Sequence, residues 1–191
     1  IGLECYEDFQ QRMPRNEVQA IGDIVTKIYR EKYPNAQTTI VGSFRRGKAE
    51  CSDVDILIVD PDFYAETPAN ALDNLVERLR KEGHISHHLT EVGSSSSKHD
   101  EFKTAQSYMG VFLSPIAAGK RRRIDIKIFP WRVRSFASLY FTGDGWFNRS
   151  MRLWARQKKM FSLNDQGLFP AGKTSTNRRM KRNVLMPHDK M

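Results

Sequence analysis

The sequence predicts a mixed α/β or α+β sheet domain followed by a small, basic helical piece. Helix-like and strand-like patterns alternate as far as Pro130, which is typical of a sheet backed by helices. Apolar content is weak after residue 165, so we expect the second piece to be small or incomplete. Charge divides the chain similarly, because residues 1–119 contain 13 Lys/Arg against 18 Asp/Glu and residues 120–191 contain 18 against 4.

Three segments have the apolar spacing of amphipathic helices. In residues 14–33, apolar side chains recur at three- and four-residue steps among polar ones. Residues 69–82 (ANALDNLVERLRKE) have the same spacing and are followed by Gly83, a common helix stop. A last helix is expected over residues 148–158, after the turn FTGDG.

Four β-branched runs predict strands. Residues 38–43 (TTIVGS) and 54–59 (VDILIV) form the first two, joined by the polar segment around Gly47 and ended by Pro61. Residues 108–113 and 124–129 (IDIKIF) form the other two, with the basic turn AAGKRRR between them. The serine-rich segment 91–107 is expected to be a loop.

The composition is that of a globular protein. Hydrophobic residues make up 39% of the chain and charged residues 28%, which does not fit a disordered chain. No apolar run approaches the ~20 residues that span a bilayer, so no membrane partner is expected. Cys5 and Cys51 are too few for a disulfide framework, which favours a reducing compartment. Because the chain starts at Ile1, we expect it to be a piece of a longer protein.

The division of charge suggests a polyanionic partner. Residues 1–119 carry a net charge of −5 and residues 120–191 one of +14, which together give the net charge of +9. Cations concentrated in one part of a chain favour nucleic acid as the partner. The alternative is a solvated basic face that binds nothing.

Three aspartates on two predicted strands suggest a metal site. Side chains at i and i+2 share one face of a strand, so Asp53 and Asp55 lie together, and Asp125 has the same setting in RIDIKI. If the two strands are neighbours, the three carboxylates repel one another unless a hard cation, Mg²⁺ or Mn²⁺, neutralises them. Such a cluster holds two metal ions ~4 Å apart in phosphoryl-transfer enzymes. The alternative is that all three aspartates lie at solvated strand ends.

A possible phosphate-binding segment precedes the first aspartate. Gly42-Ser43 is expected to end a strand, and a glycine there lets backbone N–H groups approach an anion. Arg45 and Arg46 follow, and guanidinium groups bind phosphate oxygens in a bidentate way. An apolar residue, Gly-Ser, nine further residues and Asp-apolar-Asp-apolar make up the signature of nucleotidyltransferases.

Further stretches narrow the family. The chain resembles the family X DNA polymerases over residues 1–159, in the stretches CYEDFQQRMPRNEV, GSFRRGKAECSDVDILI, RRRIDIKIFP and LYFTGDGWFNRSMR. The resemblance implies a nucleotidyltransferase-type palm with a mixed sheet over residues 1–130, of which residues 1–11 would end the fingers. A partial thumb would follow over residues 131–191. We expect the N-terminal lyase domain of the family and the end of the thumb to lie outside this chain.

The resemblance also implies an activity and its partners. The activity would be that of a DNA-directed DNA polymerase of the repair type, located in the nucleus and acting in base excision repair or non-homologous end joining. It would require Mg²⁺ or Mn²⁺. Its partners would be gapped or broken primer-template DNA, a deoxynucleoside triphosphate and repair proteins.

Site residues follow from the same resemblance. Asp53, Asp55 and Asp125 match the catalytic, metal-binding aspartates, with Asp125 accepting the proton of the primer 3′-OH. The matching nucleotide-binding positions are Arg15, Gly42, Ser43, Arg46, Ser52, Tyr140, Phe141, Gly143 and Asn148. The matching DNA-binding positions are Arg123, Arg149 and Arg152, and the basic residues after 119 would contact DNA phosphates. Ser52 stands where relatives often have Gly, and Gly145 where some relatives have a larger residue.

Alternatives stay open on the sequence alone. One is a DNA-binding or end-bridging module without efficient catalysis, and another is a nucleotidyltransferase acting on RNA. Asn148 could simply cap its helix, and Tyr140 and Phe141 could be core aromatics. For the loop 91–107, the hypothesis is that it helps to bridge poorly paired DNA ends, and the alternative is a plain linker.

Overall fold

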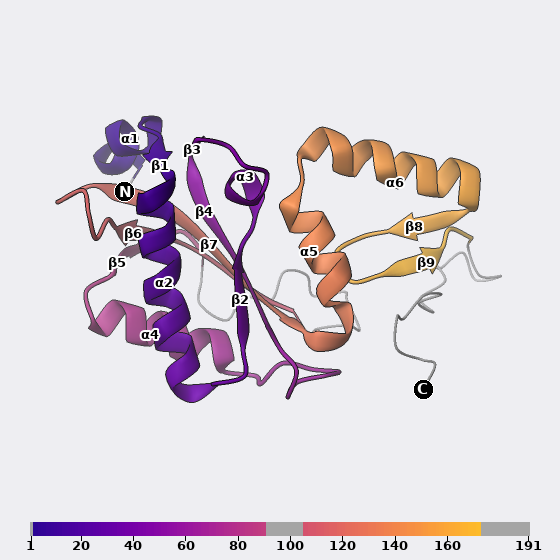
Figure 1. Ribbon diagram of the computed structural model, residues 1–191, viewed down its shortest axis with the longest axis horizontal. Coiled ribbons are helices and arrows are strands. Elements are labelled where there is room, and N and C mark those ends of the chain that lie inside the picture. The colour runs from indigo at the N-terminus through magenta and orange to yellow at the C-terminus, as the bar shows by residue number, and fades with distance from the viewer. Residues whose placement is uncertain (1, 91–104, 173–191) are drawn as a thin grey trace. The chain divides into compact units, whose positions relative to one another are not determined.

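Five strands form the central sheet of the protein, here described from a computed structural model (Figure 1). The structure describes residues 2–90 and 105–172. The chain divides into two units, residues 1–131 and 132–191, and each is described by itself. None of the described helices combines the length and the apolar character that crossing a membrane requires.

The sheet of the first unit is mixed. Its strands are β2 (Gln37–Ile40), β4 (Asp53–Asp60), β5 (Ile85–His88), β6 (Gln106–Leu113) and β7 (Arg121–Pro130). They lie in the order β2-β4-β7-β6-β5, in which only the β4–β7 pair is parallel. The predicted mixed α/β architecture is therefore confirmed, with the parallel pair at its centre.

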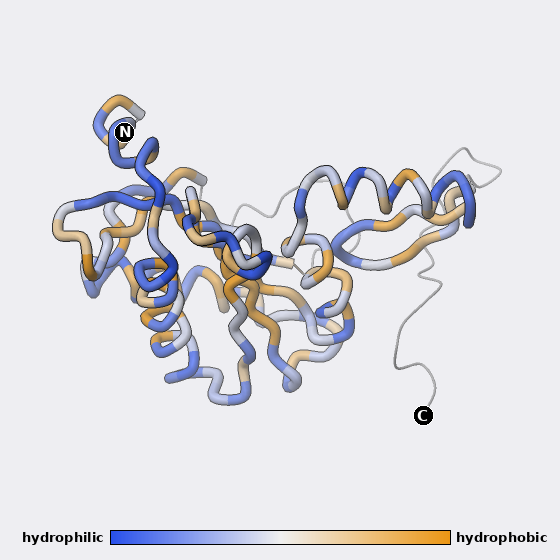
Figure 2. The backbone as a smooth tube through the Cα atoms, turned by 45° about the horizontal axis from the view of Figure 1, so that its top comes forward, coloured by the Kyte–Doolittle hydropathy of each residue, from blue (hydrophilic) through white to orange (hydrophobic). Residues whose placement is uncertain are grey.

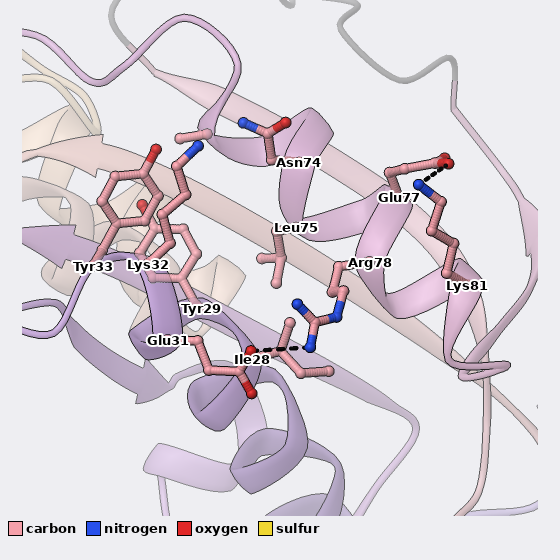
Figure 3. A pocket seen from close by; sticks show the side chains of 11 residues that line it. Ile28, Tyr29, Glu31, Lys32, Tyr33, Asn74, Leu75, Glu77, Arg78 and Lys81 are labelled. Carbon is pink, nitrogen blue, oxygen red and sulfur yellow. Dashed lines mark ion pairs between the residues drawn. The ribbon is translucent and has the colours of Figure 1, made fainter.

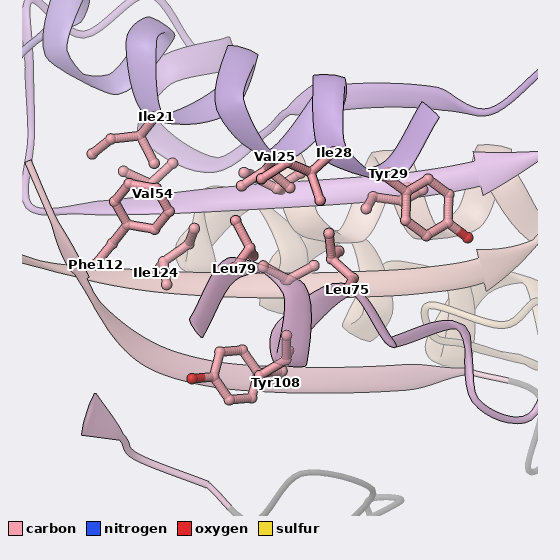
Figure 4. Packing of buried hydrophobic residues seen from close by; sticks show 14 of the residues in the cluster. Ile21, Val25, Ile28, Tyr29, Val54, Leu75, Leu79, Tyr108, Phe112 and Ile124 are labelled. Atoms are coloured by element: carbon pink, nitrogen blue, oxygen red, sulfur yellow. The ribbon is translucent and has the colours of Figure 1, made fainter. Parts of the chain in front are cut away.

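Two helices cover one face of this sheet, and both were predicted. They are α2 (Arg15–Lys32) and α4 (Ala71–Lys81). Figure 4 shows the packing, in which side chains of both helices meet alternate side chains of the strands: Ile21, Val25, Ile28, Leu75, Leu79, Val54 and Ile124. Each such side chain stabilises the fold by about 1.5–3 kcal/mol when fully buried. In Figure 2 the hydrophobic colour is correspondingly concentrated on the central strands.

The other face of the central strands carries the polar residues. Because strand side chains alternate, the residues between the buried positions of β4 and β7 point away from the two helices. This alternation places the aspartates on the face that α2 and α4 do not cover.

Shorter elements complete the first unit. They are α1 (Gly2–Gln10), the paired strands β1 (Met13–Pro14) and β3 (Glu50–Cys51), α3 (Gly42–Arg45) and the 3₁₀ turn η1 (Trp131–Val133), which continues into the second unit. The strand predicted over residues 38–43 is wrong at its end, because β2 stops at Ile40 and Gly42 begins α3 with a φ of 57°. Of the loop predicted over 91–107, residues 91–104 lie outside the described residues, and Gln106 already belongs to β6.

The second unit consists of two helices and a two-stranded sheet. Its elements are α5 (Arg134–Thr142), α6 (Gly145–Lys159), β8 (Phe161–Leu163) and β9 (Leu168–Pro170). The carboxylate of Asp144 accepts hydrogen bonds of 2.9 Å from the N–H groups of Trp146 and Phe147. Asp144 is therefore the N-cap of α6. The helix begins earlier than predicted, and Asn148 does not cap it.

Candidate active site

The parallel strands β4 and β7 bring the three predicted aspartates together. Asp55 is the register partner of Asp125, and Asp53 is the partner of Arg123. Register partners and residues two positions apart share a face, so all four side chains lie on the face opposite the helices. The condition that the two strands be neighbours is therefore met, while Asp53, the first residue of β4, keeps 41% of its side-chain surface exposed.

Asp55 is the most strongly perturbed of the three carboxyl groups. Burial raises its pKa to about 6, and the negative charges of Asp53 and Asp125 act in the same direction. The positive charges of Lys127 and Arg46 oppose this rise. The carboxyl group therefore feels both other aspartates and the predicted phosphate-binding Arg46, which places all of them in one electrostatic cluster.

Two cations partly neutralise this cluster. Lys127 Nζ donates hydrogen bonds to Asp125 Oδ1 at 2.8 Å and to Ser107 Oγ at 3.2 Å. Arg123 Nη2 lies 3.6 Å from Asp53 Oδ2. In residues 2–90 and 105–172, no three His, Cys, Asp or Glu side chains are already gathered around a common metal position. Asp53 and Asp125 are thus each paired with a cation of the same face.

Gly42 lies directly against the carboxylate of Asp55. A Cβ atom at this position would come within 2.0 Å of Asp55 Oδ2, and the φ of 57° is one that side-chain-bearing residues rarely adopt. The N–H of Val41 also donates to the carbonyl of Asp55 at 2.8 Å. The predicted Gly-Ser segment and the second aspartate therefore meet, and only glycine fits where they do.

Arg15 supports the segment that follows Ser43. Its Nη1 donates to the carbonyl oxygens of Phe44 and Lys48 at 2.8 and 2.9 Å, and its guanidinium carbon lies 3.8 Å from the centre of the Phe44 ring. These contacts engage Arg15 in holding the segment, which sequence reasoning did not foresee.

Ser52 lies between the two strands that flank it, β3 and β4. It is half-buried, and its neighbour Cys51 pairs with Met13 of β1. Residues 12–15 therefore run beside the residues that lead into β4, the strand of Asp53 and Asp55.

The basic run at the start of β7 does not form a free cationic patch. Lys120 pairs with Asp8 at 3.2 Å, and Arg121 pairs with Glu4 at 3.1 Å. Arg122 and Glu17 form a buried ion pair, in which Arg122 donates to both carboxylate oxygens of Glu17 at 2.7 and 3.2 Å. These side chains therefore already face carboxylates of α1 and α2, and the expectation that the basic residues after 119 contact DNA phosphates stays a prediction.

The predicted residues of the second unit lie in one short stretch around the start of α6. The rings of Tyr140 and Phe141 are half-buried and lie edge to face at 5.1 Å. Asn148 donates through Nδ2 to the carbonyl of Tyr140 at 2.7 Å, while its Oδ1 is buried without a hydrogen-bond partner in the described part of the chain. Gly143 ends α5 with a φ of 71°. Asn148 thus holds the end of α5 against the start of α6.

Two further predicted residues, Arg149 and Arg152, are exposed on α6. The guanidinium carbon of Arg149 lies 4.5 Å from the centre of the Trp146 ring. Both side chains are accessible to a ligand.

A pocket of about 490 Å³ lies elsewhere, between α2 and α4 (Figure 3). Its walls include the ion pairs Arg78–Glu31 at 3.0 Å and Lys81–Glu77 at 3.3 Å. It is lined by residues of the helical layer and its loops and includes none of the aspartates. The carboxylate face, and not this pocket, carries the predicted chemistry.

Comparisons with known proteins agree with these motifs. The family model described as DNA polymerase beta palm matches residues 12–131, and the one described as DNA polymerase beta thumb matches residues 137–186. The chain is 34% identical to DNA polymerase lambda of Arabidopsis thaliana over 179 residues, which are 94% of this chain and 33% of the relative. It is 38% identical to DNA polymerase lambda of Rattus norvegicus over 171 residues, which are 90% of this chain and 28% of the relative. The chain therefore spans about a third of the length of these relatives.

Proposed function

Because the chain belongs to the family X DNA polymerases, we propose that it carries the nucleotidyl-transfer site of a template-directed DNA polymerase of the repair type. It adds deoxynucleotides to a primer 3′-OH in short gaps or at broken ends. The observation that supports this most is the register of Asp55 with Asp125. Gly42 lies beside this pair, at a position that has no room for a Cβ atom. We propose residues 1–130 as the palm, with 1–11 ending the fingers, and 131–191 as a partial thumb.

The donor set fits a hard divalent cation. Three carboxylates on one face, one of them with a raised pKa because of burial and the other two charges, favour a cation bound through oxygen. Asp53, Asp55 and Asp125 would hold Mg²⁺, or Mn²⁺, which when bound would supply Lewis-acid stabilisation of the phosphoryl group and of the attacking hydroxyl.

The chain's own residues bind and orient the reactants. The carboxylate of Asp125 accepts the proton of the primer 3′-OH, and the ammonium of Lys127 beside it holds that carboxylate in place. Gly42, Ser43 and Arg46 bind the triphosphate of the incoming nucleotide, and the positive charge of Arg46 acts where negative charge develops.

Other residues support the nucleotide and the DNA. Arg15, which we propose as a nucleotide ligand, also keeps the triphosphate-binding segment in shape through its contacts with two carbonyls. We propose Ser52, directly before β4, as a further nucleotide contact. In the second unit, the nucleotide contacts are Tyr140, Phe141, Gly143 and Asn148. The DNA contacts are Arg123, Arg149 and Arg152.

We also propose a pathway and a location. We propose gapped or broken DNA and a deoxynucleoside triphosphate as substrates, base excision repair or end joining as the setting, and the nucleus as the place. Repair proteins are the proposed partners. The loop 91–107, proposed to bridge poorly paired ends, lies largely outside the described residues.

An incorporation assay on DNA with a one-nucleotide gap tests this function. The wild-type chain should add the nucleotide complementary to each of the four template bases and discriminate against ribonucleotides. Addition of one nucleotide whatever the template base would contradict template direction, and preference for ribonucleotides would favour an RNA-type transferase. Gap binding without incorporation, in the longer natural protein as well, would favour a binding or end-bridging module.

A further inference from the structure

Helix α6 exposes large apolar side chains on a strongly basic helix. Trp146 is 77% exposed, Trp154 55% and Leu153 54%, although such side chains are normally covered in a globular protein. Ala155, which lies on the opposite side of the helix from Trp146, is buried, and α6 packs against β8. Trp146, Leu153 and Trp154 therefore form an outward face of α6.

The outward face of α6 is set among cations. The helix contains five of them and no acidic residue, in the sequence GWFNRSMRLWARQKK. Two lie close to the rings, because Arg149 is 4.5 Å from the centre of the Trp146 ring and Lys159 is 5.6 Å from that of Trp154. A face of aromatic rings on a helix with five cations and no acidic residue is complementary to a polyanion that has flat apolar groups.

Single-stranded nucleic acid is a polyanion whose flat bases are exposed, whereas the bases of a duplex are covered. Unpaired bases expose both faces for stacking, and their phosphates meet the cations. In a duplex the base faces are covered by their neighbours, except at the ends. Trp146 and Trp154 are eight residues apart, about 12 Å along the helix, so the two rings contact different bases.

We propose that the outward face of α6 binds a single strand of DNA, by stacking unpaired bases on Trp146 and Trp154. The arginines and lysines of α6 contact the phosphates of the same strand. The proposal rests on the proposed function for its choice of DNA, and it adds a site for the unpaired strand beyond the gap. It needs neither nucleotide nor metal ion.

Binding of a fluorescently labelled, short oligothymidylate tests the proposal, measured by anisotropy in EDTA at low salt. An abasic oligonucleotide of the same length is the comparison, since it has the phosphates but no bases. Trp146→Ala and Trp154→Ala should each weaken oligothymidylate binding by about fivefold or more and leave abasic binding unchanged. Arg156→Gln should weaken both ligands by similar factors.

Conservative variants separate stacking from general apolar contact. Trp154→Phe should keep most of the affinity, and Trp154→Leu should lose it, with unchanged circular dichroism spectra in both. Ile116→Ala, at a 52% exposed position of the first unit, is the matched control and should bind like wild type. Equal losses on both oligonucleotides, or full affinity of the leucine variant, would overturn the proposal. Because the assay contains no nucleotide, its result is independent of whether the chain catalyses incorporation.

Discussion

Replacing Asp55 by asparagine should stabilise the protein at neutral pH while removing a proposed catalytic group. Asp55 is half-buried beside two other carboxylates, and its burial and their negative charges favour its neutral form. Asparagine has nearly the same shape and carries no charge. The substitution therefore relieves a repulsion that the folded protein keeps for its function.

The magnitude follows from the raised pKa. An increase from 3.8 to about 6 corresponds to about 3 kcal/mol. The folded state binds more protons than the unfolded state between these values, so this contribution to stability is fully present below about pH 4 and is lost as the pH rises through 6. Relative to wild type, Asp55→Asn should gain up to about 3 kcal/mol of unfolding free energy between about pH 4 and pH 7.5.

Urea unfolding in EDTA over this pH range measures the difference directly. Comparing the two proteins at each pH cancels the titration of the groups that do not interact with Asp55. Asp23→Asn, an exposed carboxylate on α2, is the matched control for the substitution itself. A difference between wild type and Asp55→Asn that stays constant from acid to neutral pH would refute the reasoning.

Three further outcomes follow from contacts in the first unit. Gly42→Ala should abolish nucleotide incorporation, because its methyl group would meet Asp55 Oδ2 at 2.0 Å. Gly47→Ala, at a position with φ 79° and open space around it, should retain activity, and gap-filling rates of the two variants measure the difference. Arg122→Met should lower the unfolding free energy by about 3–5 kcal/mol by leaving Glu17 buried without its cation, and the double variant with Glu17→Leu should recover part of this in urea unfolding; simple additivity would contradict it. Mg²⁺ should raise the thermal midpoint of wild type but not of Asp55→Asn, and equal shifts would count against the metal assignment.

The central part of the site was predictable because it depends on short-range patterns. The alternation along VDILIV and IDIKIF fixes which face each aspartate takes, and burial on α2 and α4 enforces that choice. The family motifs then identified the chain. The sequence did not predict that the strands of Asp55 and Asp125 pair, because these residues lie far apart in the chain. The three-carboxylate cluster was therefore conditional on that pairing.

The parts that sequence reasoning missed depend on long-range partners. A count of charges treats Arg121 and Arg122 as free cations, but their acidic partners lie more than a hundred residues away, with a separation of 105 between Arg122 and Glu17. Likewise, the end of β2 is decided at Gly42 by its close approach to Asp55, a contact that strand propensity cannot reveal.

The dependence of nucleotide incorporation on Asp125 and on a metal ion tests most directly the central claim, that the three aspartates form a metal-dependent nucleotidyl-transfer site. The rate of single-nucleotide addition to gapped DNA should be compared for wild type, Asp125→Asn and the control Asp23→Asn, in Mg²⁺ and in EDTA. The account predicts addition only with the metal ion, a loss of about 100-fold or more in Asp125→Asn, and a wild-type rate in the control. An Asp125→Asn variant as fast as wild type, or equal rates in EDTA, would contradict it.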